Sequence, residues 1–330
     1  MLLELGTAYV SQHQPETARE YLAEALQIAE KLADVNFKRQ VLNKLGDAFA
    51  EERKFEKAID YYQQGLNIAQ ELNNRDGESY ALFKLGDAYW NLRQFLEAKE
   101  YYQQCLAIYQ ELDDHDNESR IYHQLGIVAQ EMREYEQARD FYEQALAIKI
   151  EFGDRYSQAL TYHNLGILAE KMQEYAQARV FYQQALAIKI EYGNHYSQAS
   201  TYYQLGRVAE EMAEYEQARV FYQQALDITI VYGDRYYQAK TYQQLGILAE
   251  KMQEYEQAQS HYQQALAIKI EYGDRYSQAS TYHCLGLLAE AQEDYTEART
   301  NLQKALEIYV EYKDEYWGNI TRKILERLPE

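Results

Sequence analysis

The sequence predicts an all-α protein in which about eight pairs of antiparallel helices stack one after another as a solenoid. Three observations predict this fold. A Leu-Gly pair recurs every forty residues, apolar residues inside each unit recur at spacings of three and four, and the chain of 330 residues has only two prolines. The glycines of the eight Leu-Gly pairs are Gly6, Gly46, Gly86, Gly126, Gly166, Gly206, Gly246 and Gly286.

Each forty-residue unit contains two amphipathic helical segments. In the first, at 162–171, apolar residues Tyr162, Leu165, Leu168 and Ala169 share one face. The second, at 175–192, repeats the pattern. Each helix alone would leave an apolar stripe in water, so helix must pack on helix and unit on unit.

The stretch IEYGDRYSQA at 270–279 recurs, with small changes, at 150, 190 and 230, and is predicted to be the hinge between units. Gly273 can take the left-handed conformation that closes a helix. Asp274 can then cap the amides of the next helix, as Asn194 can in its copy. Tyr276 and Ala279 are expected on the inward face of that helix. A ligand motif used four times is the less favoured interpretation.

The two ends of the chain differ from the repeating units. The first unit opens partway through its first helix, as expected of a chain cut from a longer protein. Residues 314–328 are predicted to form one extra helix that caps the array. Arg322, Lys323 and Arg327 would give it a polar outer face, and Pro329 would end it.

These residues resemble a tetratricopeptide repeat (TPR) array. Leu165-Gly166 matches the Leu-Gly of that motif, and Ala178, Tyr182 and Ala185 match its second-helix Ala, aromatic and Ala. All eight units keep this pattern, so residues 1–330 are expected to form a single TPR solenoid. The resemblance implies a right-handed superhelix whose first helices line a concave groove, and a role in binding proteins or peptides.

The repeat departs from the common motif in length and in its turns. It has forty residues rather than about 34, with Gly-Asp in place of the usual proline. Forty-residue units of this kind are similar to those of kinesin light chains, spindle-orientation adaptors and bacterial signalling proteins. The turn glycine inside each unit is absent, with Gln173, Ala213, Gln253 and Glu293 in its place. Nearly identical central units, such as GILAEKMQEY at 166–175 and 246–255, fit tandem duplication and consensus design equally.

Composition excludes several classes of function. A formal charge of −20 opposes binding to nucleic acid and to anionic membranes, and favours neutral or basic partners. Phosphate-cradling, metalloprotease, CxxC and nucleophile-elbow motifs are absent, so we expect no enzyme, no catalytic residue and no cofactor. No apolar run could span a membrane, and we expect no signal peptide, because the first residues lack a basic region and a small-residue cleavage site; Cys105 and Cys284 fit a reducing cytoplasm.

The histidines do not predict a metal site. His123, His163 and His283 share one position of the first helix in three units. Neighbouring units place such residues roughly 10 Å apart, too far to share one zinc ion at bonds of about 2 Å. We therefore expect exposed histidines in the groove.

By the resemblance, the positions six, three and two before each Leu-Gly glycine and one, four and five after it are expected to line the groove. Two sets of residues stand out at these positions. The first is a stripe on one helix, Tyr80, Phe83, Asp87 and Trp90, in which aromatic area accompanies one orienting charge. The alternative is that Phe83 and Trp90 pack as core. The second is an isoleucine line, Ile127, Ile167 and Ile247, which suits an extended peptide or amphipathic helix unless these residues are partly buried between helices. It is flanked by His123, His163, Asn164, Tyr203, Arg207 and Gln243, and by Glu170, Glu210 and Glu250.

The sequence thus predicts a non-catalytic scaffold that binds a protein or peptide, neutral or basic, in the groove. The alternative is that the array is a sensory or regulatory arm of a larger, bacterial signalling protein. Nothing in the sequence indicates an oligomeric state.

Overall fold

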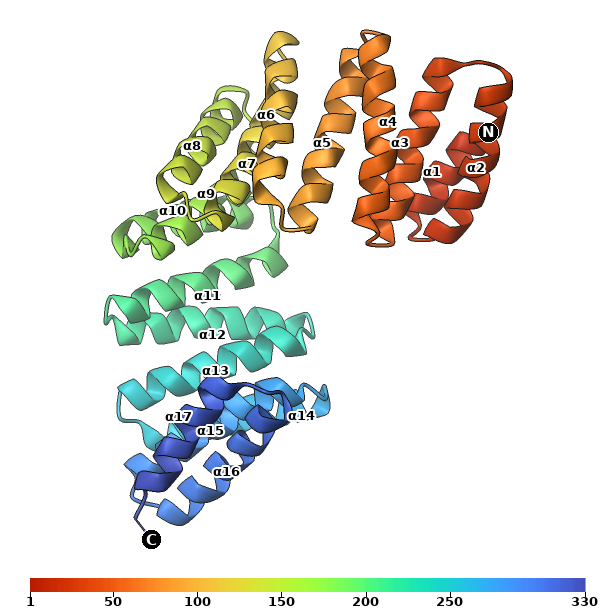
Figure 1. The fold of residues 1–330 in the computed structure, drawn as a ribbon. Helices are drawn as coiled ribbons and strands as arrows, with labels where there is room; N and C mark the ends of the chain where they lie inside the picture. The colour runs from red at the N-terminus through yellow and green to blue at the C-terminus, as the bar shows by residue number, and fades with distance from the viewer. Residues whose placement is uncertain (330) are drawn as a thin grey trace. The chain divides into compact units, whose positions relative to one another are not determined.

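The computed structural model describes residues 1–329, and in that range the chain forms seventeen α-helices and no strand (Figure 1). The fifteen helices α2 to α16 have 17 residues each, so the repeat is regular in structure as well as in sequence. None of the helices in the described range is long and apolar enough to cross a membrane. The helices are α1 Leu2–Ser11, α2 Pro15–Lys31, α3 Val35–Glu51, α4 Phe55–Glu71, α5 Arg75–Asn91, α6 Phe95–Glu111, α7 His115–Glu131, α8 Tyr135–Glu151, α9 Arg155–Lys171, α10 Tyr175–Glu191, α11 His195–Glu211, α12 Tyr215–Val231, α13 Arg235–Lys251, α14 Tyr255–Glu271, α15 Arg275–Ala291, α16 Tyr295–Glu311 and α17 Glu315–Arg327.

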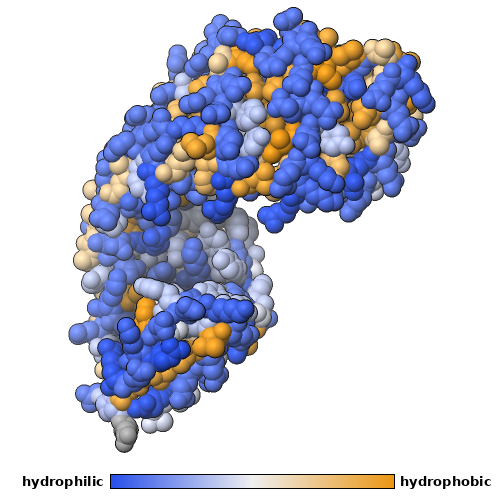
Figure 2. Space-filling view, in the orientation of Figure 1, coloured by the Kyte–Doolittle hydropathy of each residue, from blue (hydrophilic) through white to orange (hydrophobic). Residues whose placement is uncertain are grey.

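The helices gather into two compact units that we describe separately. Unit 1 is Met1–Leu168 and unit 2 starts at Ala169, so the division falls inside α9. Within each unit a helix packs on its neighbours in the sequence, as the alternating pairs predict. In unit 1, hydrophobic side chains show between hydrophilic ones over α1 to α6 (Figure 2).

The glycine of each Leu-Gly pair lets the two helices of a repeat approach closely. A Cβ atom built on Gly246 would lie 2.5 Å from Cε1 of Tyr262, which is far inside van der Waals contact. The alanines on the facing helix, Ala258 and Ala265, are fully buried. Small residues on both sides therefore set the spacing, and the second-helix tyrosine fills the space above the glycine.

The turns inside the repeats form without glycine. Arg53 has a φ of 58°, Gln253 of 62° and Glu293 of 63°, all in the left-handed region. After Arg53, the amide of Lys54 donates to the carbonyl of Phe49 at 2.9 Å and closes the end of α3. These turns therefore have the left-handed backbone conformation that glycine usually provides, and the non-glycine residues adopt it at a conformational cost that glycine would not have.

The turn between repeats is the predicted hinge. Gly273 has a φ of +66°, and Oδ1 of Asp274 accepts a hydrogen bond from the amide of Ser277 at 3.1 Å. Asn194 caps α11 in the same way, through the amide of Ser197. The expectation that Tyr276 faces inward is wrong. It lies at the surface, and its hydroxyl donates to Oδ2 of Asp314 in the next turn at 2.7 Å.

Helix α17 covers the last repeat. Its buried residues Ile324 and Leu328 pack against Leu302 and the neighbouring alanines of α15 and α16. Arg322 and Lys323 are exposed, as a capping helix requires. Arg299 of α16 donates to the carbonyls of Leu328 and Pro329, just after the helix, at 2.8 and 2.7 Å, and so holds the end of α17 against the last repeat.

Candidate functional site

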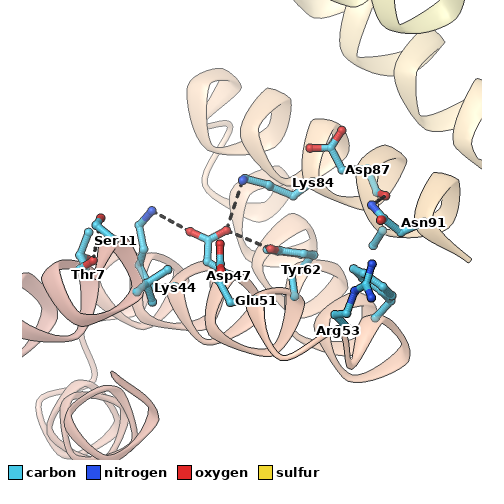
Figure 3. A pocket seen from close by; sticks show the side chains of 14 residues that line it. Thr7, Ser11, Lys44, Asp47, Glu51, Arg53, Tyr62, Lys84, Asp87 and Asn91 are labelled. Carbon is cyan, nitrogen blue, oxygen red and sulfur yellow. Dashed lines mark hydrogen bonds and ion pairs between the residues drawn. The ribbon is translucent and has the colours of Figure 1, made fainter. Parts of the chain in front are cut away.

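Unit 1 contains an open cavity of about 450 Å³ between its first helices α1, α3 and α5 (Figure 3). Ten of its fourteen lining residues come from four positions of the repeat: two before the Leu-Gly glycine, and one, four and five after it. These are positions that the sequence predicts to face the groove. The charged and polar residues at these positions in α3 and α5 are Lys44, Asp47, Glu51, Lys84, Asp87 and Asn91.

Asp47 is the centre of a hydrogen-bonded cluster in this cavity. Its carboxylate accepts from the hydroxyl of Tyr62 at 2.9 Å, from that of Tyr80 at 2.6 Å and from Nζ of Lys44 at 2.8 Å. Nζ of Lys84 lies 3.5 Å away, and Figure 3 shows the side chains of Lys44, Tyr62 and Lys84 directed at Asp47. Burial alone would raise the pKa of Asp47, but the two lysines, together with the hydrogen bonds from Lys44 and Tyr80, hold it below its ordinary value.

Asp87 occupies the same position one repeat later, in a different environment. Its Oδ1 accepts from the hydroxyl of Tyr102 at 2.6 Å. Burial raises the pKa of Asp87, and the opposing fields of Lys84 and Arg120 do not cancel that effect. The lysines thus outweigh the effect of burial at Asp47, whereas Lys84 and Arg120 do not outweigh it at Asp87, although both carboxylates line the same cavity.

The predicted aromatic stripe is divided by the structure. Tyr80 bonds to Asp47 on the preceding first helix. Phe83 packs on the core, with its ring centroid 5.9 Å from that of Tyr102, so the core interpretation holds for this residue. Trp90 is 38% exposed, but it is not among the residues that line the cavity.

The acids at the groove positions accept hydrogen bonds from the second-helix tyrosines. The hydroxyl of such a tyrosine is buried and needs an acceptor, and the first helix supplies an acid from either of two positions. In the two repeats of Gly46 and Gly86 in unit 1 it is the Asp one residue after the glycine, and in unit 2 it is the Glu four residues after it; the repeat of Gly126 has Ile127 and Gln130 at these positions. The pairs are Tyr62–Asp47 and Tyr102–Asp87 in unit 1, and Tyr182–Glu170, Tyr222–Glu210 and Tyr262–Glu250 in unit 2.

The glutamates of unit 2 are consequently not the open acidic row that the sequence suggests. Glu170 also faces Arg207 at 3.4 Å, and Glu210 also faces Lys251 at 2.8 Å. The side chains of both glutamates are 8% exposed. Hydrogen bonds and ion pairs within the protein occupy these carboxylates, so they are poorly placed to meet basic residues of a partner.

The expectation of exposed groove histidines is wrong for His123 and His283, which are both buried. Nε2 of His123 lies 3.0 Å from Nδ2 of Asn164, and burial with the nearby charge of Lys149 lowers the pKa of His123 to about 4. His283 contacts Thr321 of the capping helix. His163 is half-buried. Among residues 1–329 no three His, Cys, Asp or Glu side chains are grouped so as to hold a metal ion.

Unit 2 has a smaller cavity of about 280 Å³, and it includes a cation that sequence reasoning missed. Nζ of Lys240 lies 4.4 Å from the ring centroid of Tyr203, which is itself buried. Gln243 lines the cavity and accepts a hydrogen bond from Lys269. Lys240 stands six residues before its Leu-Gly glycine, a predicted groove position, so a scan of that row for charge would have found it.

The isoleucine line is half-buried throughout. Ile127, Ile167 and Ile247 all have intermediate exposure. Ile247 packs against the core cluster of Tyr262 and Leu285 and also lines the cavity of unit 2. This agrees with partial burial between first helices rather than with a fully open apolar track.

Family models for the tetratricopeptide repeat match residues 1–71, 78–151, 157–230, 241–276 and 278–312. The chain belongs to the tetratricopeptide repeat family. This confirms the resemblance and the all-α TPR solenoid fold that the sequence predicts. No curated protein matches the chain.

Several solved TPR structures share the fold. The apo form of the quorum sensor NprR from B. thuringiensis is 16% identical, with a TM-score of 0.65 over 93% of this chain and 86% of that one. A Rap protein complexed with competence and sporulation factor is 14% identical, with a TM-score of 0.55 over 99% and 96%. The nearly identical TPR-like repeats of a Podospora anserina putative kinesin light chain are 19% identical, with a TM-score of 0.52 over 58% and 95%.

Proposed function

We propose that this protein is a non-catalytic scaffold that binds a peptide segment of a protein partner in the groove of unit 1. The observation that carries the proposal is the open cavity between α1, α3 and α5, with Asp87 at its wall. TPR arrays present their first helices to ligands, and the cavity is large enough for one or two side chains of an extended peptide.

Asp87 suggests the chemistry of the ligand. Because burial raises its pKa, the ionised carboxylate is held at a cost that a nearby cation would reduce. Asp47 is already paired with Lys44 and Lys84, so a lysine or arginine of the ligand gains more electrostatic binding energy at Asp87 than at Asp47. The exposed ring of Trp90, one turn further along α5, could add apolar area to the same peptide.

The fold neighbours support a peptide as ligand. One of them is a Rap protein solved with competence and sporulation factor, and another is called a quorum sensor. At 14% and 16% identity they share the fold alone, so the chemistry of the ligand rests on the residues of this chain.

A phage-displayed library of random linear peptides, selected on the full chain, tests the proposal. We expect enriched peptides to carry a basic residue, and to bind Asp87→Asn at least about tenfold more weakly, since a charge-assisted hydrogen bond contributes about 1.5–3 kcal/mol. Trp90→Ala should also weaken binding. Phe83→Ala is unsuitable because it opens the core.

Asp227→Asn is the matched control, because it removes an equal charge from an exposed site on α12 of unit 2. It should leave peptide affinity unchanged. Selection of acidic peptides, or equal weakening by Asp87→Asn and Asp227→Asn, would refute the assignment of the groove. Circular dichroism should show the same helix content in all variants.

A regulatory arm is the second candidate, and the quorum sensor among the fold neighbours favours it. In that case a peptide bound in unit 1 should change hydrogen exchange in the helices of unit 2. If the protein is a scaffold that only binds its partner, we expect protection from hydrogen exchange to be confined to α1 through α5.

A further inference from the structure

The turns between the repeats of unit 2 expose large side chains at three positions each. Ile190, Tyr192 and Tyr196 stand at the first of these turns, and the same positions recur forty, eighty and one hundred and twenty residues later, with Val310 in place of isoleucine at the last. We call these twelve residues the turn ladder. Each of them is between 44% and 69% exposed.

The fold does not require apolar side chains at these positions. In unit 1 the corresponding turn between α4 and α5 has Gln70 and Asp76 at the first and third positions, and the next turn has Gln110 and Asp116. All four are exposed, as their counterparts in unit 2 are. The same structural element therefore tolerates polar residues, and the apolar character of the turn ladder needs an explanation other than folding.

Aromatic rings are in contact at two of the three steps of the ladder. The ring of Tyr196 lies 5.5 Å from that of Tyr232 in the next turn, and the ring of Tyr276 lies 5.4 Å from that of Tyr312. The hydroxyl of Tyr196 also donates to Asp234 at 2.6 Å. These contacts hold the aromatic side chains in place, so a partner would meet rings that have already lost much of their freedom.

The two arginines beside the ladder are paired with glutamates of this chain. Arg235 pairs with Glu271 of the following turn at 2.6 Å, and Arg275 pairs with Glu311 at 3.3 Å. An acidic ligand would therefore find both arginines already occupied. The surface instead suits an apolar, uncharged counterpart, which is unusual for a chain with a formal charge of −20.

The exposed area is large enough for a stable interface. A half-exposed tyrosine presents roughly 100 Å², so the twelve residues present on the order of 1,000 Å². A standard protein interface buries about 800 Å² on each partner, whereas an ordinary monomer surface rarely has more than a few hundred Å² of contiguous apolar area.

We infer that the turn ladder is a homodimer interface, on which the ladder of a second copy of this chain docks about a two-fold axis. A two-fold axis pairs a surface with itself, so the forty-residue period of one ladder meets the same period in the other.

Sedimentation equilibrium of the full chain tests this inference. We expect a monomer–dimer equilibrium that tightens when the salt rises from about 0.1 to about 0.5 M, because screening weakens the repulsion between two acidic chains. The triple variant Ile230→Gln, Tyr236→Asp and Ile270→Gln gives two turns the side-chain types found in unit 1. It should weaken dimerisation by on the order of 100-fold.

The control is Leu96→Gln, Val180→Gln and Val220→Gln, which removes three exposed apolar side chains from second helices outside the ladder. It should dimerise as the unmodified chain does. Concentration-dependent protection from hydrogen exchange should appear at residues 228–236 and 268–276. A chain that stays monomeric at every concentration, or a triple variant that dimerises like the control, would overturn the inference, and the former would favour another protein as occupant. Neither outcome bears on peptide binding at Asp87.

Discussion

Units 1 and 2 are built from the same repeat but satisfy the same buried hydroxyl differently. In unit 1, Tyr62 donates to Asp47, one residue after the Leu-Gly glycine. In unit 2, Tyr262 donates to Glu250, four residues after it. The first choice places a carboxylate and its lysines in the cavity, and the second leaves that position to Ile247.

The difference teaches how a repeat array can vary its surface without changing its frame. A buried tyrosine requires an acceptor, but two positions of the facing helix can supply one. Unit 1 uses the position that makes its groove polar, and its turns after α4 and α6 have polar residues at two of the three ladder positions, whereas the turn after α8 exposes Ile150, Phe152 and Tyr156. Unit 2 encloses its acids and exposes tyrosine and isoleucine at its turns. We therefore propose different roles for the two units: the groove of unit 1 for a ligand and the turns of unit 2 for a second copy.

The largest expected effect comes from removing the acid at the centre of unit 1. Asp47→Ala would leave Lys44, Lys84 and two tyrosine hydroxyls without their acceptor, and breaking such a buried cluster costs about 3 kcal/mol. Native-state hydrogen exchange in α3 to α5 should report this loss.

Asp87→Asn is the variant to compare with Asp47→Ala. It keeps an acceptor for the hydroxyl of Tyr102 and removes a carboxylate whose pKa is raised. It should leave the stability of α5 and α6 unchanged or improve it at neutral pH. Equal losses for the two variants would show that the environments of the two acids do not differ as described.

Unit 1 should weaken in acid through His123. Its pKa of about 4 lies below the value of about 6.5 in the unfolded chain, so the unfolded state binds the extra proton first. The stability contributed by neutral His123 is complete above pH 6.5 and falls as pH decreases toward 4, by about 2.5 kcal/mol at pH 4.5. Hydrogen exchange in α7 and α8 at several pH values measures it, and His123→Gln should flatten the profile.

Unit 2 should strengthen in mild alkali through its buried lysines. Burial lowers the pKa of Lys189 and Lys269 to about 8, below the value of about 10.4 in the unfolded chain. Below pH 8 both lysines are charged in the folded and in the unfolded chain. Above pH 8 the folded state loses its proton first, so each lysine increases the free energy of unfolding by about 2 kcal/mol by pH 9.5.

Urea unfolding followed by circular dichroism at pH 7.5 and 9.5 tests this gain. The variant Lys189→Met and Lys269→Met should be more stable at pH 7.5 and should lose the rise with pH. A rise that persists in this variant would assign the effect to other groups.

The smallest effect concerns the turns between repeats. Gly273 and Asn73 both have a positive φ, of 66° and 48°, in units 2 and 1. A Cβ on Gly273 would meet nothing within 4 Å, so Gly273→Ala should cost about 1 kcal/mol from backbone conformation alone. Asn73→Gly should change stability by a few tenths of a kcal/mol at most, because asparagine tolerates this conformation. Thermal unfolding of the two variants gives the comparison, and loss of peptide affinity in Gly273→Ala would contradict a purely structural hinge.

Much of the fold could be predicted because its signals are local. The forty-residue period, the spacing of apolar residues and the Gly-Asp turn locate the helices and their caps without any knowledge of distant contacts. The positions that line the cavity of unit 1 were likewise predictable, since helical periodicity decides which side chains share a face. Tyr276 was misplaced because the first turn of a helix at the end of a pair lies beyond the packed interface.

Which groove residues remain available for a ligand could not be predicted, because that depends on partners elsewhere in the chain. Glu170 and Asp87 both lie at groove positions, yet Glu170 is held by Tyr182 and Arg207. His123 lies at another groove position and is buried by its neighbours. By itself the sequence determined the helices, their pairing and the hinge, through short-range periodicity and turn chemistry. Only the tertiary structure decided which carboxylates are neutralised and which apolar side chains stay uncovered, because burial and charge pairing arise between residues that the fold brings together.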